Sequence, residues 1–422
     1  KKRESISERS DRMKLPHKHS SEESNMLSIN FIEKIIGYQE VIIKNIEEAN
    51  ENLYIHMMMK RKECVCPVCK RKTNRVHDYR KQMVRELNAF GKKVWIILQK
   101  RRYVCSCGKR FIEPVPFLPR YQRMTQRCTI EMINRLADVR SYTAVAKEFE
   151  VSVSTVIRRF EYINYPKPDK LPEMIGIDEF KGNSGGQKYH CILTDLKTGR
   201  VIDIIRTRYE HDLIDYFKKY DRSGVSVFVS DMYSTYSEIA ETYFPKAIYV
   251  IDRYHWIRQA IWAFEAVRKE VQKKFSKSHR IYFKHSRKLL LKRECKLSTE
   301  EHRQVNIMLY ASAELSTAYF LKEELYRVLD EVENPDKQKA AFEKWISDAE
   351  CSGLSAFERC AKTYNKWKIP ILNSLRCPYT NGFTEGCNNK IKILKRNAYG
   401  LKNFKRFRNR ILFLFSSQRC RA

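Results

Sequence analysis

Three acidic residues lie where a carboxylate needs a cation or a strong hydrogen-bonding partner. Asp178 lies within one apolar run, Asp231 ends a second apolar run, and Glu385 opens a polar, basic stretch. A carboxylate inside or at the end of a buried strand loses its hydration, so its charge must be compensated. Three such groups brought together repel one another unless divalent cations lie between them. Because hard oxygen ligands suit Mg²⁺ or Mn²⁺, the sequence predicts such a cation at these carboxylates.

The chain around these residues is strongly basic. Its 422 residues carry a formal net charge of +32, and the positive charge is concentrated between residues 60 and 110 and after residue 385, where no Asp or Glu follows. Blocks this biased usually meet a polyanion, although a solvated basic face is the alternative. Acidic metal ligands inside a basic protein indicate chemistry on a phosphodiester backbone.

Length and composition exclude several classes of protein. The chain is long enough for roughly two to four domains, and its hydrophobic content of 43% excludes global disorder. No apolar run approaches the ~18–20 residues that a membrane-spanning helix needs. The first thirty residues are polar, so no signal peptide is expected, and the thirteen cysteines then indicate a reducing cytoplasm. We expect a cytoplasmic protein without a membrane partner.

Two cysteine pairs have the spacing of a zinc site. Cys66 and Cys69 form one knuckle, and Cys105 and Cys107 form a second, with a strand-like hairpin between them. Two such knuckles can close a tetrahedral thiolate site for a structural Zn²⁺. The Cys-x-Cys spacing is tighter than usual, so Cys64 is an alternative ligand. The other interpretation is a set of reduced core cysteines.

Residues 124–162 carry apolar residues at helical spacing. Ser152 or Ser154 can cap the second of two short helices. This pattern predicts a helix-turn-helix, although any small helical hairpin has a similar one. The side chains predicted to face a DNA groove are Ser154, Thr155, Arg158 and Arg159.

Beyond a proline-marked linker the pattern changes to strands. The expected order is strands at 173–180, 188–195 and 200–208, a helix at 210–220, a strand at 225–230, a helix at 233–244 and a strand at 247–251. This β-β-β-α-β-α-β order is that of the ribonuclease-H-like mixed sheet of the α/β class. It places Asp178 at the centre of the sheet and Asp231 at the end of an adjacent strand, where the two can face each other.

The segment from 256 to 375 is helical, charged and free of strand signals. Its length predicts an all-α insertion that separates Glu385 from the strands in sequence. A final helix from Thr384 would pack on the sheet and return Glu385 to the aspartates. Basic residues on this last segment neutralise phosphates. The residues predicted to contact DNA here are Asn388, Lys392, Lys395, Arg396, Arg406 and Arg408.

The predicted organisation has five parts. They are a flexible basic tail (1–25), a zinc-binding β module (26–118), a helix-turn-helix (119–165), a ribonuclease-H-like catalytic domain (166–255 and 376–422) and an α-helical insertion (256–375).

Each carboxylate also has a purely structural interpretation. Asp178 could simply end a strand, Asp231 could cap the following helix, and Glu385 could lie at a helix N-terminus that favours negative charge. His255 either contacts the scissile phosphate or is a core histidine. Asp252 is a rival metal ligand.

Several motifs resemble one known family. The block from Asn381 to Ile411 closely resembles the C-terminal block of DDE insertion-sequence transposases of the ISL-three type. The segment from Arg102 to Phe111 is similar to the end of that family's zinc module, and the Ile177–Glu179 and Ile251–His255 motifs are also similar. The resemblance covers roughly residues 60 to 415 and implies that Asp178, Asp231 and Glu385 form the catalytic triad.

The resemblance implies a DNA transposase. Such an enzyme binds the terminal inverted repeats of its insertion sequence and performs Mg²⁺-dependent strand cleavage and strand transfer with two metal ions. Its partners would be double-stranded DNA, both transposon ends and target, at the nucleoid in the bacterial cytoplasm. Because two ends must be held together, a homodimer is expected. The alternatives are a DNA-binding regulator and a structure-specific nuclease on the same fold.

Overall fold

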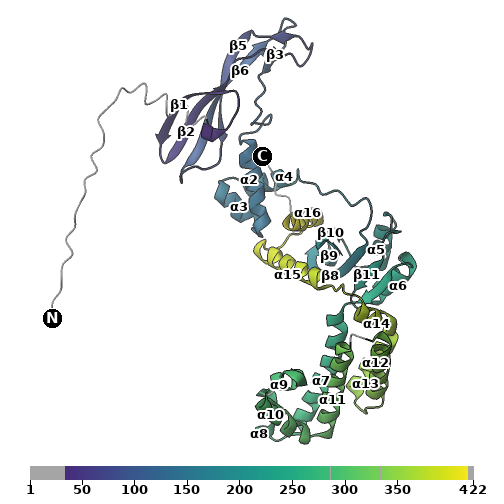
Figure 1. The fold of residues 1–422 in the computed structure, drawn as a ribbon. Helices are drawn as coiled ribbons and strands as arrows, with labels where there is room; N and C mark the ends of the chain where they lie inside the picture. Colours follow the sequence, from purple (N-terminus) through teal and green to yellow (C-terminus); the bar gives the residue numbers. More distant parts are fainter. Residues whose placement is uncertain (1–33, 286, 332–333, 417–422) are drawn as a thin grey trace, which may run out of the picture. The chain divides into compact units, whose positions relative to one another are not determined.

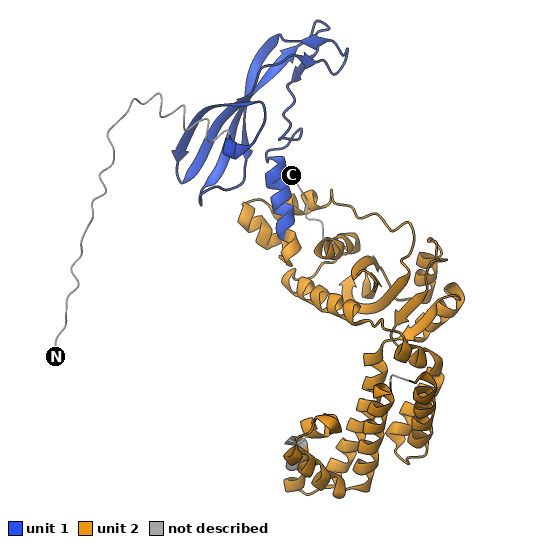
Figure 2. Ribbon diagram, in the orientation of Figure 1, with its two compact units in different colours: residues 1–135, 419–422 blue, residues 136–418 orange. Residues whose placement is uncertain are grey.

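The computed structural model describes residues 34–285, 287–331 and 334–416, which form two compact units (Figure 1). The first unit ends at Arg135 and the second begins at Leu136 (Figure 2). The predicted flexible tail, residues 1–25, lies outside the described residues. In the described part of the chain, no helix is both long and apolar enough to cross a membrane.

The first unit is built on a five-stranded sheet in the order β1-β2-β6-β5, with β7 pairing β6. The strands are β1 (Val41–Ala49), β2 (Asn52–Met59), β5 (Val76–Arg85), β6 (Lys93–Val104) and β7 (Arg110–Ile112). β2 and β6 are parallel, and the other pairs are antiparallel. The predicted β-rich module is therefore present, and Gly91 forms the turn before β6 with φ of 73°.

Alternation along the strands forms the core of this unit. Val94, Ile96 and Leu98 are buried at every second position of β6, so one face of the sheet is covered. A helix, α2 (Gln126–Asn134), follows the sheet, and its N-terminus is capped by the Thr125 side chain. A small hairpin of β3 (Cys64–Val65) and β4 (Lys72–Thr73) carries the first cysteine knuckle.

The second unit contains a mixed sheet in the order β10-β9-β8-β11-β12. Its elements are β8 (Met174–Ser184), β9 (Gln187–Asp195), β10 (Arg200–Ile205), α5 (Glu210–Phe217), β11 (Val227–Ser230), α6 (Ser234–Tyr243) and β12 (Ile248–Ile251). β8, β9 and β10 are antiparallel neighbours, whereas β11 is parallel to both β8 and β12. The predicted order of strands and helices is confirmed, and the ends differ by a few residues.

Successive side chains of each strand point to opposite faces of this sheet, and helices cover both faces. Ile175 and Ile177 of β8 belong to a core shared with α5 and α6. Phe180, on the opposite face of β8, packs against α15 (Gly382–Asn397) and α16 (Phe404–Phe415). The sheet is therefore the middle of three layers, and Asp178 lies on the face that α15 and α16 cover.

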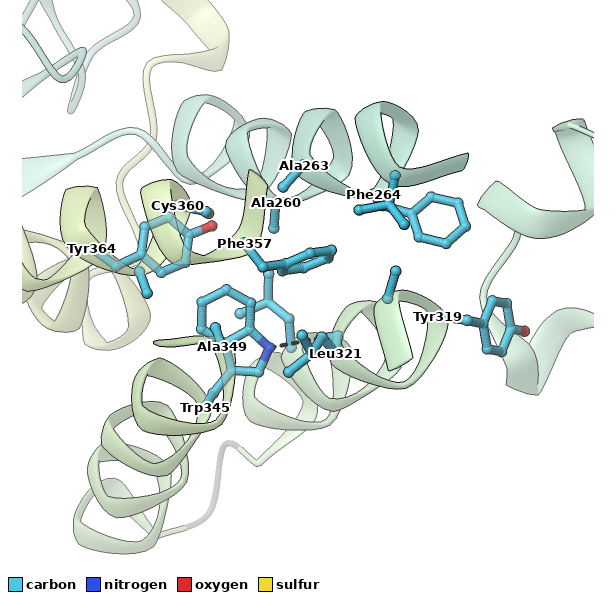
Figure 3. Close-up of a cluster of buried hydrophobic side chains, with 14 of the residues drawn as sticks. Ala260, Ala263, Phe264, Tyr319, Leu321, Trp345, Ala349, Phe357, Cys360 and Tyr364 are labelled. Atoms are coloured by element: carbon cyan, nitrogen blue, oxygen red, sulfur yellow. Dashed lines mark hydrogen bonds between the residues drawn. The ribbon is translucent and has the colours of Figure 1, made fainter. Parts of the chain in front are cut away.

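Between β12 and α15 the chain forms an insertion that is helical throughout its described part. Its α-helices are α7 (Arg253–Lys274), α8 (Lys277–His285), α9 (Arg287–Leu291), α10 (Thr299–Tyr310), α11 (Ala313–Asp330), α12 (Pro335–Glu350), α13 (Ser355–Lys366) and α14 (Lys368–Arg376). Large aromatic residues fill its core, including Trp345, Phe357 and Tyr364 (Figure 3). The Trp345 indole N–H donates to the Leu321 carbonyl over 2.6 Å, so its polar atom is satisfied inside that core.

The insertion ends beside the point where it begins. Arg253, the first residue of α7, donates from Nε to the Ser374 carbonyl over 2.6 Å and from Nη2 to the Cys377 carbonyl over 3.0 Å. The Trp256 indole N–H donates to the Ser374 hydroxyl over 3.0 Å. These contacts return the chain to the sheet directly before α15. Glu385, which lies on α15, is thereby brought back to the sheet that carries the two aspartates.

Two short helices, α3 (Tyr142–Phe149) and α4 (Val153–Phe160), begin the second unit. Ser141 and Ser152 cap them, so the first of the two predicted capping serines is the one used. Glu150 adopts the left-handed conformation, with φ of 51°, in the tight turn between the helices. Val156 and Phe160 are buried, which leaves the opposite face of α4 to solvent.

Candidate active site and nucleic-acid interface

Strand register places the two aspartates side by side. β8 and β11 are parallel, and the last residues paired between them are Gly176 and Val229. Two residues further along the chain are Asp178, which is still in β8, and Asp231, which directly follows the end of β11, so the two carboxylates lie at the same level. They share the face of Gly176 and Val229 because side chains alternate along a strand, and neighbouring strands lie about 4.8 Å apart.

α15 brings Glu385 to the same face. Asn381, four residues earlier, donates from Nδ2 to the Ile177 carbonyl over 3.0 Å. Asn388, three residues later, donates from Nδ2 to Asp178 Oδ2 over 2.7 Å. Residues at i−4, i and i+3 share one side of a helix. Glu385 therefore lies on the side of α15 that faces β8, and its own side chain is exposed.

α15 packs closely against the sheet at Gly176 because this residue has no side chain. A Cβ atom at Gly176 would lie 2.8 Å from Asn381 Oδ1 and equally close to side-chain atoms of Thr194 and Leu196. The Thr194 and Thr384 hydroxyl oxygens lie 2.8 Å apart across the same junction. A side chain at residue 176 would therefore push α15, and with it Glu385, away from the sheet.

The three carboxylates share one electrostatic environment. Burial, followed by the charges of neighbouring carboxylates that include Asp178 and Glu385, raises the pKa of Asp231 to about 8. Burial also raises the pKa of Asp178 to about 6, although the Glu179 N–H and Asn388 donate to its carboxylate and oppose the rise. Both pKa values are raised because no nearby positive charge among the described residues balances the two ionised carboxylates. A bound cation would supply that positive charge.

The arrangement is open. The three carboxylates are not among the described groups whose ligand atoms all lie within 4.8 Å of one another. The sequence predicted a single cation-holding cluster, and the structure instead shows one shared face. Asp231 Oδ1 is buried without a hydrogen-bond donor. A buried carboxylate oxygen without a donor fits a divalent cation, so these residues fit the metal that the sequence predicted.

His255 and Asp252 flank the site from the start of α7. His255 Nε2 lies 3.0 Å from Asp231 Oδ1, but the ring is not oriented to donate a hydrogen bond. Its side chain is partly exposed, and burial lowers its pKa. Asp252 accepts the Asn381 N–H over 2.6 Å and the Tyr254 N–H over 2.9 Å. Both Asp252 oxygens thus help to hold α7 and α15 in place.

Some of the residues predicted to contact DNA are exposed, and others already contact other residues of the protein. Ser154, Arg158, Lys392 and Arg396 are exposed, and Thr155, Arg159 and Lys395 are partly exposed. Three others make contacts within the protein. Asn388 is buried against Asp178, Arg408 donates to Asp203 over 2.6 Å, and Arg406 donates to Glu161 over 2.7 Å. Asn388 and Arg408 therefore point into the protein, whereas Arg406 remains at the surface, and a DNA contact of these residues stays a prediction.

Four cysteines in the first unit form the one closed ligand group found among the described residues. The sulfur atoms of Cys66, Cys69, Cys105 and Cys107 all lie within 4.8 Å of one another. The Cys69–Cys105 and Cys66–Cys107 pairs are 3.4 Å and 3.7 Å apart. A tetrahedral zinc with Zn–S bonds of about 2.3 Å has sulfur atoms about 3.8 Å apart. This donor set therefore fits Zn²⁺.

Backbone geometry shapes both knuckles. Left-handed conformations at Lys70 and Gly108 close the two turns. The Arg71 N–H donates to the Cys69 sulfur and, with Cys105, lowers the pKa of that thiol to about 6, which favours the thiolate that binds metal. Cys64 is buried outside the group, with its sulfur 3.8 Å from the Lys62 carbonyl. The tight Cys-x-Cys spacing is therefore sufficient without Cys64.

Comparison with known proteins agrees with this geometry. A family model described as "Transposase" for ISL3 elements matches residues 175–411. Two further models match: "zinc-finger of transposase IS204/IS1001/IS1096/IS1165" at residues 62–107, and "Helix-turn-helix domain of transposase family ISL3" at residues 113–164. The matched regions contain the cysteine group, the two capped helices and all three carboxylates.

One curated relative matches nearly the whole chain. It is the transposase for insertion sequence element IS1001 of Bordetella parapertussis, 27% identical over 393 residues, which are 90% of this chain and 96% of that protein. A short match, 43% identical over 56 residues, covers 18% of a protein named ATP-dependent protease from Lactococcus lactis subsp. lactis.

These matches define an enzyme that rearranges DNA through a DDE domain and carries its own DNA-binding helices. The transposase model alone covers more than half of the chain. The chain belongs to the ISL3 family of transposases.

Proposed function

We propose that this transposase binds the terminal inverted repeats of its insertion sequence and cleaves and joins DNA strands at Asp178, Asp231 and Glu385. The observation that carries the proposal is the hydrogen bond from Asn388 to Asp178, because it fixes the helix that bears Glu385 against the strand that bears Asp178. The register of β8 and β11 supports the place of Asp231.

The three carboxylates would hold Mg²⁺ or Mn²⁺, with Asp178 central and Asp231 and Glu385 on either side. Two such ions, when bound, stabilise the attacking and leaving oxygens of an in-line displacement at phosphorus. Asn388 holds one oxygen of Asp178 in place, which leaves the other directed by the Glu179 N–H. Asp231 Oδ1 is buried and accepts no hydrogen bond from the described residues, so it is the oxygen that would bind a cation.

One site can run two reactions because the chemistry at phosphorus is the same. With water as the nucleophile, a new P–O bond forms, the bond to the 3′ oxygen of the transposon end breaks, and a free 3′-OH results. With that 3′-OH as the nucleophile, a bond to a target phosphate forms and the target strand breaks at the same phosphate. The exposed Glu385 side chain keeps the site accessible to a DNA strand.

The strand order supports a ribonuclease-H-like catalytic domain. Three antiparallel strands continue into two parallel ones, with helices on both faces. We divide the chain accordingly into a zinc module (26–118), a helix-turn-helix (119–165), the catalytic domain (166–255 and 376–422) and the helical insertion (256–375).

Sequence reading would belong to α4, where Ser154 and Arg158 are exposed. The exposed Lys392 and Arg396 would bind phosphates without reading bases. A structural Zn²⁺ on the four cysteines would stabilise the basic N-terminal module. A homodimer is proposed because strand transfer needs both ends of the element in one complex.

The direct test is Asp178→Asn with a labelled transposon end. The variant should bind the end as the unmodified protein does and lose Mg²⁺-dependent cleavage. A matched control is Asp195→Asn, which alters another buried carboxylate of the same sheet but keeps an oxygen to accept the Lys197 N–H. Cleavage retained in Asp178→Asn would exclude the proposed site. Cleavage without joining by the unmodified protein would favour a structure-specific nuclease, and binding alone would favour a regulator.

A further inference from the structure

α16 lies between the catalytic sheet and the helices α3 and α4 (Figure 1). One face of α16 packs on the sheet through Phe407, Ile411 and Leu414. The Phe407 ring centroid lies 6.1 Å from that of Phe180, which is two residues beyond Asp178 in β8. This face of α16 is therefore in direct contact with the strand that carries a catalytic carboxylate.

The other face of α16 holds the helix-turn-helix through Arg410. Its side chain is 1% exposed and donates to the Leu136 carbonyl over 2.6 Å and to the Arg140 carbonyl over 2.8 Å. The guanidinium also lies 5.4 Å and 5.6 Å from the ring centroids of Tyr142 and Phe160. One buried cation thus contacts the segment before α3, the first turn of α3 and the last turn of α4.

Further contacts extend this junction in both directions. Asn409 donates to the Ile163 carbonyl over 3.1 Å, and Arg408 donates to the Tyr165 carbonyl over 3.1 Å. Asn397, at the end of the helix that carries Glu385, donates to the Val139 carbonyl over 3.2 Å. The residues that precede α3 and those that follow α4 are therefore also joined to the C-terminal helices.

The placement of Arg410 is costly for stability alone. Its guanidinium donates to the backbone carbonyls of Leu136 and Arg140, and the desolvation of a charge without a counter-ion is unfavourable. Burial accordingly lowers its pKa to about 10. In contrast, the covalent connection between α4 and β8 contains exposed residues such as Pro166 and Lys170. The contacts through α16 therefore hold α4 independently of this connection.

We propose that α16 fixes the distance between the base-reading helix α4 and the Asp178 site, and that Arg410 thereby determines which phosphodiester of the transposon end is cut. Arg410 is a positioning residue in this scheme, since it contacts neither DNA nor the carboxylates. The inference rests on the proposed function and adds to it the structural origin of the cleavage position.

The experiment compares cleavage positions at single-nucleotide resolution on an end-labelled transposon end. The unmodified protein should cut at one phosphate. Arg410→Ala should bind the end with unchanged affinity but cut at several neighbouring phosphates. The rate at the original phosphate should fall by about 10-fold or more, because a displacement of about 1 Å can cost up to about 100-fold. Arg410→Lys, which keeps the charge and can donate to one carbonyl, should lie between the two.

A second variant tests the alternative that the covalent connection sets the distance. Insertion of Gly-Ser-Gly between Pro168 and Asp169 should leave the cut position of an otherwise unmodified protein unchanged, because α16 still holds α4. The same insertion combined with Arg410→Ala should widen the spread of cuts. The insertion variant gives a result even if Arg410→Ala does not fold.

Two results would overturn the inference. One is a shift of the cut by the insertion alone, and the other is a single, unshifted cut by folded Arg410→Ala. Both leave the proposed function intact, since cleavage itself is observed. The absence of any cleavage by the unmodified protein would overturn the proposed function and this inference together.

Discussion

Asn388 on α15 and Asp178 on β8, 210 residues apart in the chain, are joined by a hydrogen bond of 2.7 Å. Asn388 is buried, and its Oδ1 has no donor. The Asn388 side-chain amide therefore hydrogen-bonds to the Asp178 carboxylate only. Its N–H group lowers the pKa of Asp178 and so opposes the effect of burial. This pair links the position of α15, which carries Glu385, to the charge of Asp178 on β8.

Replacement of Asn388 should reduce cleavage without reducing DNA binding. In Asn388→Ala, the loss of a hydrogen bond to a charged group removes about 1.5–3 kcal/mol, which corresponds to about 10- to 100-fold in cleavage rate if the bond is needed throughout. Asn388→Asp should be worse, because it adds a negative charge beside Asp178. The measurement is the cleavage rate as a function of Mg²⁺ concentration.

Asn389→Ala is the matched control for this pair, because Asn389 is exposed and accepts from Lys392 instead. Its cleavage rate should equal that of the unmodified protein. An Asn388→Ala variant with an unchanged Mg²⁺ dependence and rate would show that the hydrogen bond has no part in positioning Asp178.

The metal-free protein should lose stability as the pH rises. The folded-state pKa values of Asp178 and Asp231, about 6 and about 8, lie above the usual value of 3.8. Below pH 3.8 both groups are protonated in the folded and unfolded states. Between pH 3.8 and the folded-state values the unfolded chain has lost these protons while the folded protein still binds them, so the free energy of unfolding falls as the pH rises and levels off above about pH 8. Thermal unfolding between pH 5 and 9 without divalent metal measures this effect.

Mg²⁺ should reverse that trend, because the deprotonated carboxylates are the species that bind it. The thermal shift on adding Mg²⁺ should therefore be larger at pH 8.5 than at pH 5.5. The double variant Asp178→Asn with Asp231→Asn should show little of either effect. An Mg²⁺ shift of the same size at both pH values would contradict the assignment of these groups.

Zinc content should depend on four cysteines and not on the fifth. Cys66→Ser or Cys105→Ser should lower the zinc bound per chain and destabilise the first unit, because the binding energy of a structural zinc is part of the folding energy. Cys64→Ser should retain zinc, since its sulfur lies outside the group. Elemental analysis of the purified variants checks both statements, and zinc loss in Cys64→Ser would place Cys64 among the ligands.

Much of the fold followed from local patterns. The alternation in 174–195 and 225–251 predicted the strand order of the catalytic sheet, because apolar periodicity and turn residues are local signals. The role of Asn388 could not be predicted in this way. A helix with polar residues on several sides does not reveal which of them meets a strand 210 residues away, and that depends on the packing of α15 over Gly176.

The inward direction of Arg408 had a signal that was available in the sequence. Asp203 lies within the apolar strand β10, in the same kind of setting that identified Asp178. The rule that a buried carboxylate needs a cation applies equally to both. Asp203 is paired with an arginine, whereas among the described residues neither Asp178 nor Asp231 forms an ion pair with a lysine or an arginine. The distinction between a structural and a catalytic carboxylate thus depends on tertiary contacts.

Arg408 and Arg396 should therefore behave in opposite ways when replaced. Arg408→Ala leaves Asp203, which is 1% exposed, without its ion-pair partner. Loss of one partner of a buried pair costs about 3–5 kcal/mol, so the unfolding midpoint of Arg408→Ala in urea should fall clearly. Its DNA affinity at a given salt concentration should change little while the protein remains folded.

Arg396→Ala removes an exposed charge and should leave the urea midpoint unchanged. If Arg396 binds a phosphate, the slope of log affinity against log salt should decrease in magnitude by about 0.9. The double variant Asp203→Ala with Arg408→Ala should recover part of the lost stability, because no unpaired buried charge remains. A weaker salt dependence in Arg408→Ala together with an unchanged urea midpoint would show that this arginine faces DNA, as its sequence alone suggested.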